Sequence, residues 1–126
     1  NASTVLNLWV SDSPLAKFKP HPKTPIVVSP KNARMAGGIL RIKDSLIRFG
    51  QNNEGEYGKS LSTLMIDKLT PKDYSEKYIG RVKIDNYNGP HTLNFSVDTN
   101  LITFDYYTNK FSFFAGVRRI AGLLNK

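Results

Sequence analysis

Polar, cationic and glycine residues in this chain stand at the ends of short apolar runs, and their types suit the binding of a polar ligand. A guanidinium offers a planar fork of donors to carboxylate, phosphate or paired hydroxyl groups. Side-chain amides both donate and accept, which suits sugar hydroxyls, and a tyrosine ring can stack on a sugar face. The candidate ligand-binding residues are Arg34, Gln51, Asn52, Tyr57 and His91.

Two residues are candidates for acid–base chemistry. His91 follows Gly89-Pro90 at the start of an expected strand, and an imidazole can exchange a proton near neutral pH. Glu56 lies in a polar loop flanked by glycines. Glycoside hydrolysis normally uses two carboxylates roughly 5 to 10 Å apart, and no second acid pairs convincingly with Glu56. The carboxylate set is therefore incomplete, and the sequence leaves open whether the chain catalyses a reaction.

The same candidates have ordinary structural interpretations. An arginine beside glycines can bond loop carbonyls, amides at a strand end can cap a turn, and a tyrosine can pack in a core. A lone histidine is commonly hydrogen-bonded within the fold, and we expect that role for His21, which stands between two prolines.

Composition excludes several classes of site. The chain has no cysteine, which rules out disulfides and thiolate chemistry, and its two histidines lie in unlike contexts, so we expect no metal site. No phosphate-cradling glycine loop, dinucleotide fingerprint or Ser-His-Asp elbow is present, so we expect no cofactor. No apolar run approaches the roughly 20 residues that a membrane helix needs, and no secretory leader opens the chain, which leaves the compartment undetermined.

The formal net charge is +8, and most of the excess lies in one stretch. Residues 15–48 contain eight Lys or Arg against a single acid. This stretch is either a solvated basic face or a surface that attracts a polyanion or a partner chain. Nucleic acid is the less favoured polyanion, because the aromatic residues alternate within strands instead of interleaving with the basic ones. The lysines concerned are Lys17, Lys19, Lys23 and Lys31.

The elements that must position these residues are strands. Apolar residues alternate with polar ones, and turn residues separate the apolar runs. Two hairpins are predicted, one over residues 38–49 and one over residues 92–106. Thr70-Pro71 predicts a single helical turn before the next strand. The expected strands cover residues 5–10, 26–28, 38–43, 45–49, 60–69, 79–84, 92–97 and 101–106, with a last one beginning at 111.

About nine short strands with turns between them predict an all-β fold of antiparallel meander sheets, in a sandwich, a barrel or a propeller. A propeller blade has four antiparallel strands, so the chain would supply about two blades, approximately residues 4–69 and 76–120. The whole chain, 1–126, is then a single all-β domain or a partial propeller. Because a propeller needs about four to eight blades, partner copies in a homo-oligomer or additional blades would complete the ring.

Several motifs resemble a known family in their order and spacing. Residues 8–15 and 18–27 (Leu-Trp-Val-Ser-Asp-Ser-Pro-Leu, then Phe-Lys-Pro-His-Pro-Lys-Thr-Pro-Ile-Val) resemble the segment that crosses between blades in glycosidase-like five-bladed propellers. The later motifs look like one branch of that group, the N-terminal domain of glucosamine inositolphosphorylceramide transferases, whose bacterial relatives are named formyltransferase-like or hydrolase-like. Those motifs are Ala-Arg-Met-Ala-Gly-Gly at 33–38, Arg-Phe-Gly-Gln-Asn at 48–52, Tyr-Gly at 57–58, Leu-Thr-Pro-Lys-Asp-Tyr at 69–74 and Gly-Pro-His-Thr-Leu-Asn at 89–94.

This resemblance implies a fold and a ligand class more than a reaction. It implies a five-bladed propeller, a segment of which binds or processes a carbohydrate or sugar phosphate. For an enzyme it implies glycoside hydrolase-like chemistry or part of a glycosyltransferase. Thr24 stands where the family pattern has an asparagine, and Asn52 stands where it has an acid. We therefore expect carbohydrate binding or processing, with a non-enzymatic basic module as the alternative.

Overall fold

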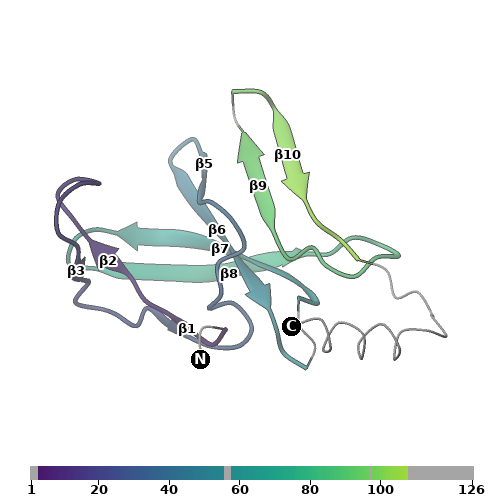
Figure 1. The fold of residues 1–126 in the computed structure, drawn as a ribbon, viewed down its shortest axis with the longest axis horizontal. Helices are drawn as coiled ribbons and strands as arrows, with labels where there is room; N and C mark the ends of the chain where they lie inside the picture. The colour runs from purple at the N-terminus through teal and green to yellow at the C-terminus, as the bar shows by residue number, and fades with distance from the viewer. Residues whose placement is uncertain (1–2, 56–57, 97, 108–126) are drawn as a thin grey trace, which may run out of the picture.

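The computed structural model describes residues 3–55, 58–96 and 98–107. Within these ranges every strand pair is antiparallel and there is no helix, which confirms the all-β prediction. The strands are β1 (Val5–Leu6), β2 (Trp9–Val10), β3 (Lys19–Pro20), β4 (Val27–Val28), β5 (Leu40–Ile42), β6 (Ser45–Asn52), β7 (Ser60–Leu69), β8 (Tyr74–Val82), β9 (Leu93–Ser96) and β10 (Leu101–Phe104) (Figure 1).

Strands β5 to β8 form a four-stranded meander in chain order (Figure 1). Lys43, with a φ of 53°, lies in the turn between β5 and β6, so the first predicted hairpin is confirmed. The predicted helical turn is wrong, and β8 begins at Tyr74 instead of near residue 79. The reason is local. Thr70 N–H donates to Asp73 O (3.0 Å) and Asp73 N–H donates to Thr70 Oγ1 (2.9 Å), which closes a tight turn between β7 and β8.

Alternation along β6 gives this sheet two chemically different faces, because successive side chains of a strand point in opposite directions. Ile47, Phe49 and Gln51 point to one side, here named the apolar face. Arg48 and Asn52 point to the other side, here named the polar face. Antiparallel pairing with β7 continues both sides across the sheet, and it adds the buried apolar residues Leu64 and Ile66 to the side that carries Arg48.

The core lies on the apolar face, where β9 packs against β6. Phe49 stacks on Phe95 with ring centroids 5.7 Å apart, and Leu61 and Leu93 are buried beside them. Ala36 completes the cluster, and its carbonyl accepts from Leu93 N–H at 2.8 Å. The hairpin of β9 and β10 confirms the second hairpin prediction, and it projects on the same side of β7 and β8 as the β5–β6 hairpin (Figure 1).

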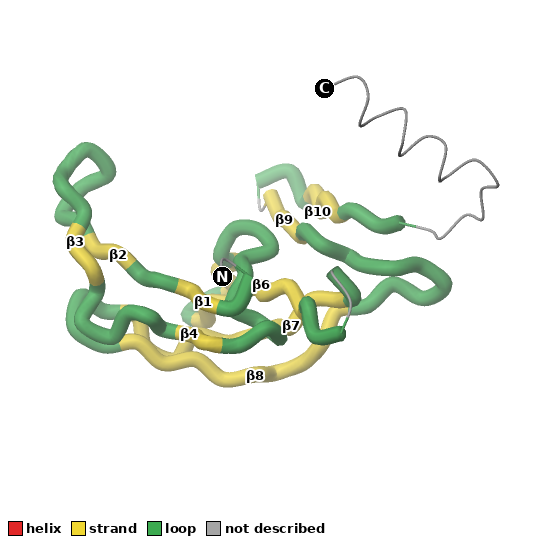
Figure 2. The backbone as a smooth tube through the Cα atoms, turned by 60° about the horizontal axis from the view of Figure 1, so that its bottom comes forward, coloured by secondary structure: helices red, strands yellow, loops and turns green. Residues whose placement is uncertain are grey.

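The N-terminal segment, residues 3–33, covers the polar face. In this segment β1 pairs with β4 and β2 pairs with β3, and Figure 2 shows β1 and β4 on the inner side of the curved strand β8. His21 anchors the segment: it is 2% exposed, its Nε2–H donates to Thr70 O (2.9 Å), and its Nδ1 accepts from Lys23 N–H (3.1 Å). His21 therefore has the structural role expected from its position between prolines.

The division into blade regions at 4–69 and 76–120 stays a prediction. The four-stranded sheet takes β7 and β8 from the two sides of that boundary, and the strand expected from residue 111 lies outside the described residues. Across the part of the chain that the structure describes, no helix has the length and apolar character needed to cross a membrane.

Candidate functional site

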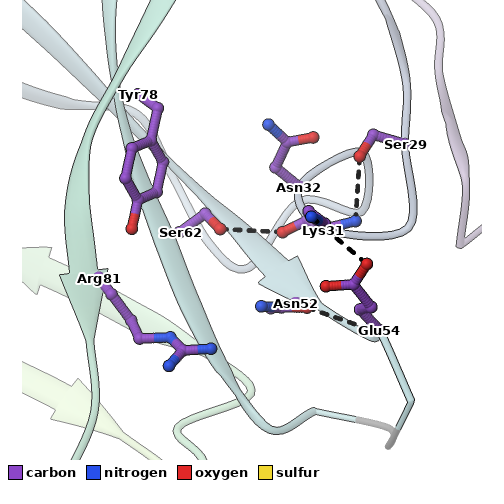
Figure 3. Close-up of a pocket in the computed structure, with 8 residues that line it drawn as sticks. All are labelled: Ser29, Lys31, Asn32, Asn52, Glu54, Ser62, Tyr78 and Arg81. Atoms are coloured by element: carbon purple, nitrogen blue, oxygen red, sulfur yellow. Dashed lines mark hydrogen bonds and ion pairs between the residues drawn. The ribbon is translucent and has the colours of Figure 1, made fainter.

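A polar pocket of about 440 Å³ opens between the N-terminal segment and the polar face of the sheet (Figure 3). Tyr78 and Arg81 of β8 lie on one side of it, and the loops that carry Lys31 and Glu54 lie on the other. The lining residues are Ser29, Lys31, Asn32, Asn52, Glu54, Ser62, Tyr78 and Arg81.

Strand register and one close backbone contact position this pocket. Ser62 of β7 is paired with Gly50 of β6 and with Arg81 of β8, so the three residues form one row across the sheet. A Cβ on Gly50 would lie 2.3 Å from Asn32 O, so only glycine allows the N-terminal segment to approach this closely. Ser62 Oγ donates to Lys31 O (2.9 Å), which fastens that segment to the row.

Positive charge exceeds negative charge in the pocket. Lys31 Nζ and Glu54 Oε1 form an exposed ion pair at 3.3 Å. Arg81 has neither a hydrogen bond nor an ion pair to any described residue through its guanidinium. The pocket thus presents one guanidinium that no carboxylate of the described residues neutralises. A planar guanidinium binds phosphate or carboxylate through two parallel hydrogen bonds.

Amide groups add donors and acceptors beside these charges. Asn32 Oδ1 is buried and has no hydrogen-bond partner among the described residues. Asn52 is 9% exposed, and its Oδ1 accepts from Glu54 N–H at 3.0 Å. Because a buried acceptor without a partner costs roughly 1 to 3 kcal/mol, a ligand hydroxyl that donates to Asn32 Oδ1 would gain that energy back.

A second polar region forms where the motifs at 33–38 and 89–94 meet on the other side of β6. Gln51 connects them: its backbone N–H donates to Arg34 O (2.7 Å), and its Nε2 donates to His91 O (2.8 Å). Gly38 N–H donates to Asn94 Oδ1 (3.1 Å). We name this region the Gln51 junction, after the residue that links the two motifs.

His91 at this junction is held by the carboxylate of Asp105. His91 Nδ1 lies 3.1 Å from Asp105 Oδ2, while Asp105 Oδ1 accepts from the backbone N–H groups of His91 and Thr92, both at 2.7 Å. Burial acts to raise the pKa of Asp105, but the hydrogen bonds from Thr92 and His91 outweigh it and the pKa lies below its ordinary value. The imidazole stacks on Tyr107, with ring centroids 5.2 Å apart.

The residues predicted to bind a ligand divide between these two regions. Gln51 and His91 meet at the junction together with the backbone of Arg34, whose side chain is exposed. Asn52 points to the opposite face and lines the polar pocket. Tyr57 and Glu56 lie outside the described residues. The assignment of all six predicted site residues as ligand-binding or catalytic stays a prediction.

A buried ion pair beneath the N-terminal segment borders this arrangement. Arg48 is 2% exposed; its Nε donates to Glu76 Oε2 (2.8 Å), a second nitrogen donates to Glu76 Oε1, and Nη1 donates to Asn32 O (2.8 Å). Tyr74 Oη also donates to Glu76. Burial, and then the hydrogen bond and charge of Glu76, raise the pKa of Tyr74 well above its ordinary value.

Sequence reasoning did not find Ser29 and Asn32 of the polar pocket. It also missed three further lining residues, namely Ser62, Tyr78 and Arg81. They come from β7 and β8, whose mutual register decides which of their side chains share a face. That register contains two irregularities, between Thr63 and Leu64 and again after Ile66, so strict alternation along the sequence gives no signal for it. The described residues contain no cluster of three side chains suited to hold a metal ion.

Comparison with known proteins places the chain in a family. The family model described as "Glucosamine inositolphosphorylceramide transferase 1, N-terminal" matches residues 1–98. The chain belongs to this family. Glucosamine inositolphosphorylceramide transferase 1 of Oryza sativa subsp. japonica is 38% identical over 73 residues, which is 56% of this chain and 10% of that protein. The protein of the same name from Arabidopsis thaliana is 32% identical over 100 residues, which is 73% of this chain and 13% of that protein.

Family membership confirms the resemblance to the N-terminal domain of glucosamine inositolphosphorylceramide transferases, and the five-bladed propeller stays a prediction. The chain spans only about a tenth of the length of these relatives, at 10% and 13%. No solved structure gives a significant match. All lining residues of the polar pocket fall within the matched range, whereas Asp105 of the Gln51 junction falls beyond it.

Proposed function

We propose that this chain binds a carbohydrate that carries a negatively charged group, such as a sugar phosphate, in the polar pocket. The observation that carries the proposal is the guanidinium of Arg81, which has no partner among the described residues and lies across the pocket from Lys31. Asn32 Oδ1 and the amide of Asn52 supply acceptors and donors for hydroxyl groups.

The names of the relatives support the ligand class. They contain glucosamine, a sugar, and a phosphorylated inositol, a polyol, and both are rich in hydroxyl groups. We propose that the chain contributes carbohydrate binding to a transferase of this family. We assign no reaction to it. Glycoside hydrolysis normally uses two carboxylates, and Glu54 is the one acid among the described residues that line the polar pocket.

We further propose that the sheet of β5 to β8 is one blade of a five-bladed propeller. Its support is the four-stranded antiparallel meander in chain order, which is the layout of a propeller blade. In this arrangement β9 and β10 begin the next blade, which packs on the apolar face through Phe49 and Phe95. Blades from a longer polypeptide or from partner copies would close the ring.

Calorimetric titration with myo-inositol 1-phosphate tests the ligand proposal, with myo-inositol and inorganic phosphate as the separate parts. We expect the intact compound to bind more tightly than either part. Arg81→Gln should weaken binding about ten- to a hundredfold, because hydrogen bonds to charged groups contribute about 1.5 to 3 kcal/mol. Arg41→Gln, at an exposed arginine of β5, is the matched control and should bind as the wild type does. Equal binding by both variants would refute the proposal.

The alternative function, a basic module for a polyanion, is less favoured by the structure. Of the four lysines concerned, Lys23 pairs with Asp73 (3.4 Å) and Lys31 pairs with Glu54 (3.3 Å). Pairing reduces the charge that these lysines offer to a polymer. A titration would identify such a site, because its affinity for the polyanion falls steeply as the salt concentration rises.

A further inference from the structure

A separate apolar pocket of about 200 Å³ lies on the polar face of the sheet, between the sheet and the N-terminal segment. Leu6, Leu8 and Ile26 line it from the N-terminal segment. Ile66 and Leu69 line it from β7. The two layers therefore border a space whose walls are mostly branched aliphatic side chains, beside the buried ion pair of Arg48 and Glu76.

The polar residues among the described lining residues are Arg48, Tyr74 and Asn7, and Asn7 Oδ1 accepts from Thr24 Oγ1 at 3.5 Å. The guanidinium of Arg48 and the hydroxyl of Tyr74 both donate to Glu76, so neither needs a partner from a ligand. Among the described lining residues the amide of Asn7 is then the one polar side chain that a ligand could reach, so the hydrophobic effect supplies most of the retention inside the pocket. The pocket therefore selects a group that has no polar atoms of its own, because such atoms would lose their hydration without compensation.

The lining is mainly aliphatic, which suits an alkyl chain. Tyr74 is the one aromatic residue among the described lining residues, so an aromatic ligand would gain little stacking. Met35 also lines the pocket, and its unbranched thioether can adjust to irregular shapes. A cavity of about 150 Å³ lined by aliphatic residues is large enough to hold a small apolar molecule, so this pocket can hold several methylene groups.

We propose that this apolar pocket binds a short linear alkyl group, such as one end of an amphiphile. Ile39, which is 46% exposed, and Leu69, which is 43% exposed, mark the side through which such a group enters. This site is independent of the carbohydrate proposal, since it uses different residues and recognises no charge.

The test is a titration of the chain with unbranched alcohols from butan-1-ol to decan-1-ol, followed by NMR. Affinity should rise about fourfold with each added CH₂ until the alkyl chain fills the pocket, and should then stop rising. Nuclear Overhauser effects should connect the alkyl protons to methyl groups of Leu8, Ile26 and Ile66. A continued rise without a limit, or the absence of these effects, would overturn the proposal.

Variants at the entrance distinguish binding inside this pocket from general adsorption of the alcohol to the protein surface. Ile39→Trp should weaken octan-1-ol binding at least tenfold by filling the entrance, and Leu69→Trp provides a second variant of the same kind. Ile79→Trp is the matched control, since Ile79 is 47% exposed on β8 and lies outside the pocket lining. Amide spectra check that each variant is folded. Unchanged octan-1-ol binding by both entrance variants would refute the site. Arg81→Gln should leave octan-1-ol binding unchanged, whatever its effect on the binding of sugar phosphate.

Discussion

Arg48 of β6 and Glu76 of β8 join their side chains across the intervening strand β7, with exposed side-chain fractions of 2% and 10%. Arg48 is in register with Leu64, and Glu76 is in register with Ile66, so the ion pair spans the polar face diagonally. The contact fixes β8 relative to β6 beneath the N-terminal segment, whose Asn32 O accepts from the same guanidinium.

Removing one partner of this ion pair should destabilise the fold strongly. Arg48→Met leaves the Glu76 carboxylate buried without its cation, and we expect a loss of about 3 to 5 kcal/mol in the free energy of unfolding. Lys77→Ala breaks an exposed pair with Asp67 (3.3 Å) and serves as the control, with an expected loss of about 0 to 1 kcal/mol. Urea denaturation measures both, and similar losses for the two variants would contradict the assignment of Arg48 as a buried anchor.

Lowering the pH should destabilise the Gln51 junction, because the Asp105 carboxylate becomes protonated. The pKa of Asp105 is lowered in the folded state, so its stabilising contribution is present above the unfolded-state pKa, near 3.8, and is lost as the pH falls through the folded value. Asp105→Asn should lower the stability at neutral pH and flatten the stability profile in the acid range below about pH 4.

Unfolding curves between about pH 2 and 7 test this expectation. Asp12→Asn changes an exposed carboxylate at a bend and is the control. A wild-type profile that is already flat across the acid range, or one that Asp105→Asn leaves unchanged, would show that the carboxylate contributes nothing.

Gly58 should tolerate no side chain, for two separable reasons. Its φ is +64°, a left-handed backbone conformation that costs other residues roughly 1 to 2 kcal/mol, and a Cβ there would lie 1.7 Å from His91 Cδ2. Gly55 has a φ of +77° and open space around it, so Gly55→Ala should show the backbone cost alone.

A double-mutant cycle isolates the contact with His91. Gly58→Ala should destabilise the wild type more than Gly55→Ala does, and the excess should disappear when His91 is replaced by alanine. Thermal unfolding of the variants measures this coupling. Equal losses for Gly58→Ala with and without His91 would contradict the packing of the imidazole against the Gly58 backbone.

Adjacent residues of β6 should affect sugar-phosphate binding differently. Asn52 lines the polar pocket, so Asn52→Ala should weaken the binding of myo-inositol 1-phosphate about two- to tenfold, the value of a typical hydrogen bond. Gln51 points to the opposite face, so Gln51→Ala should leave binding unchanged while lowering stability through the lost bond to His91 O. A stronger binding loss in Gln51→Ala would move the ligand site to the Gln51 junction.

The sequence predicted local features of the fold more fully than the relations between strands. Period-two alternation and turn residues located the hairpins over residues 38–49 and 92–106, since a strand with one buried face leaves that pattern directly in the sequence. The helical turn expected at Thr70 failed because capping residues such as threonine stabilise tight β-turns as well as helix starts.

The candidate site was only partly predictable from the sequence, because the pairing of the strands decides which residues share a face of the sheet. Gln51 and Asn52 were found together as amides at the end of a strand, but their separation onto two faces follows from the pairing of β6 with its neighbours. Arg81 gave no local signal, because its place in the pocket depends on the irregular register between β7 and β8. Asp105 meets His91 only when the second hairpin closes.

The strict alternation along β6 leaves this strand no room for insertions or deletions. A slip of one residue would turn Arg48 into the hydrophobic cluster and would expose Phe49 to the layer that holds the polar pocket. The same slip would exchange Gln51 with Asn52, so both polar regions would fail together. Evolutionary change in length should therefore be confined to the flanking turns, while β6 itself keeps a constant number of residues.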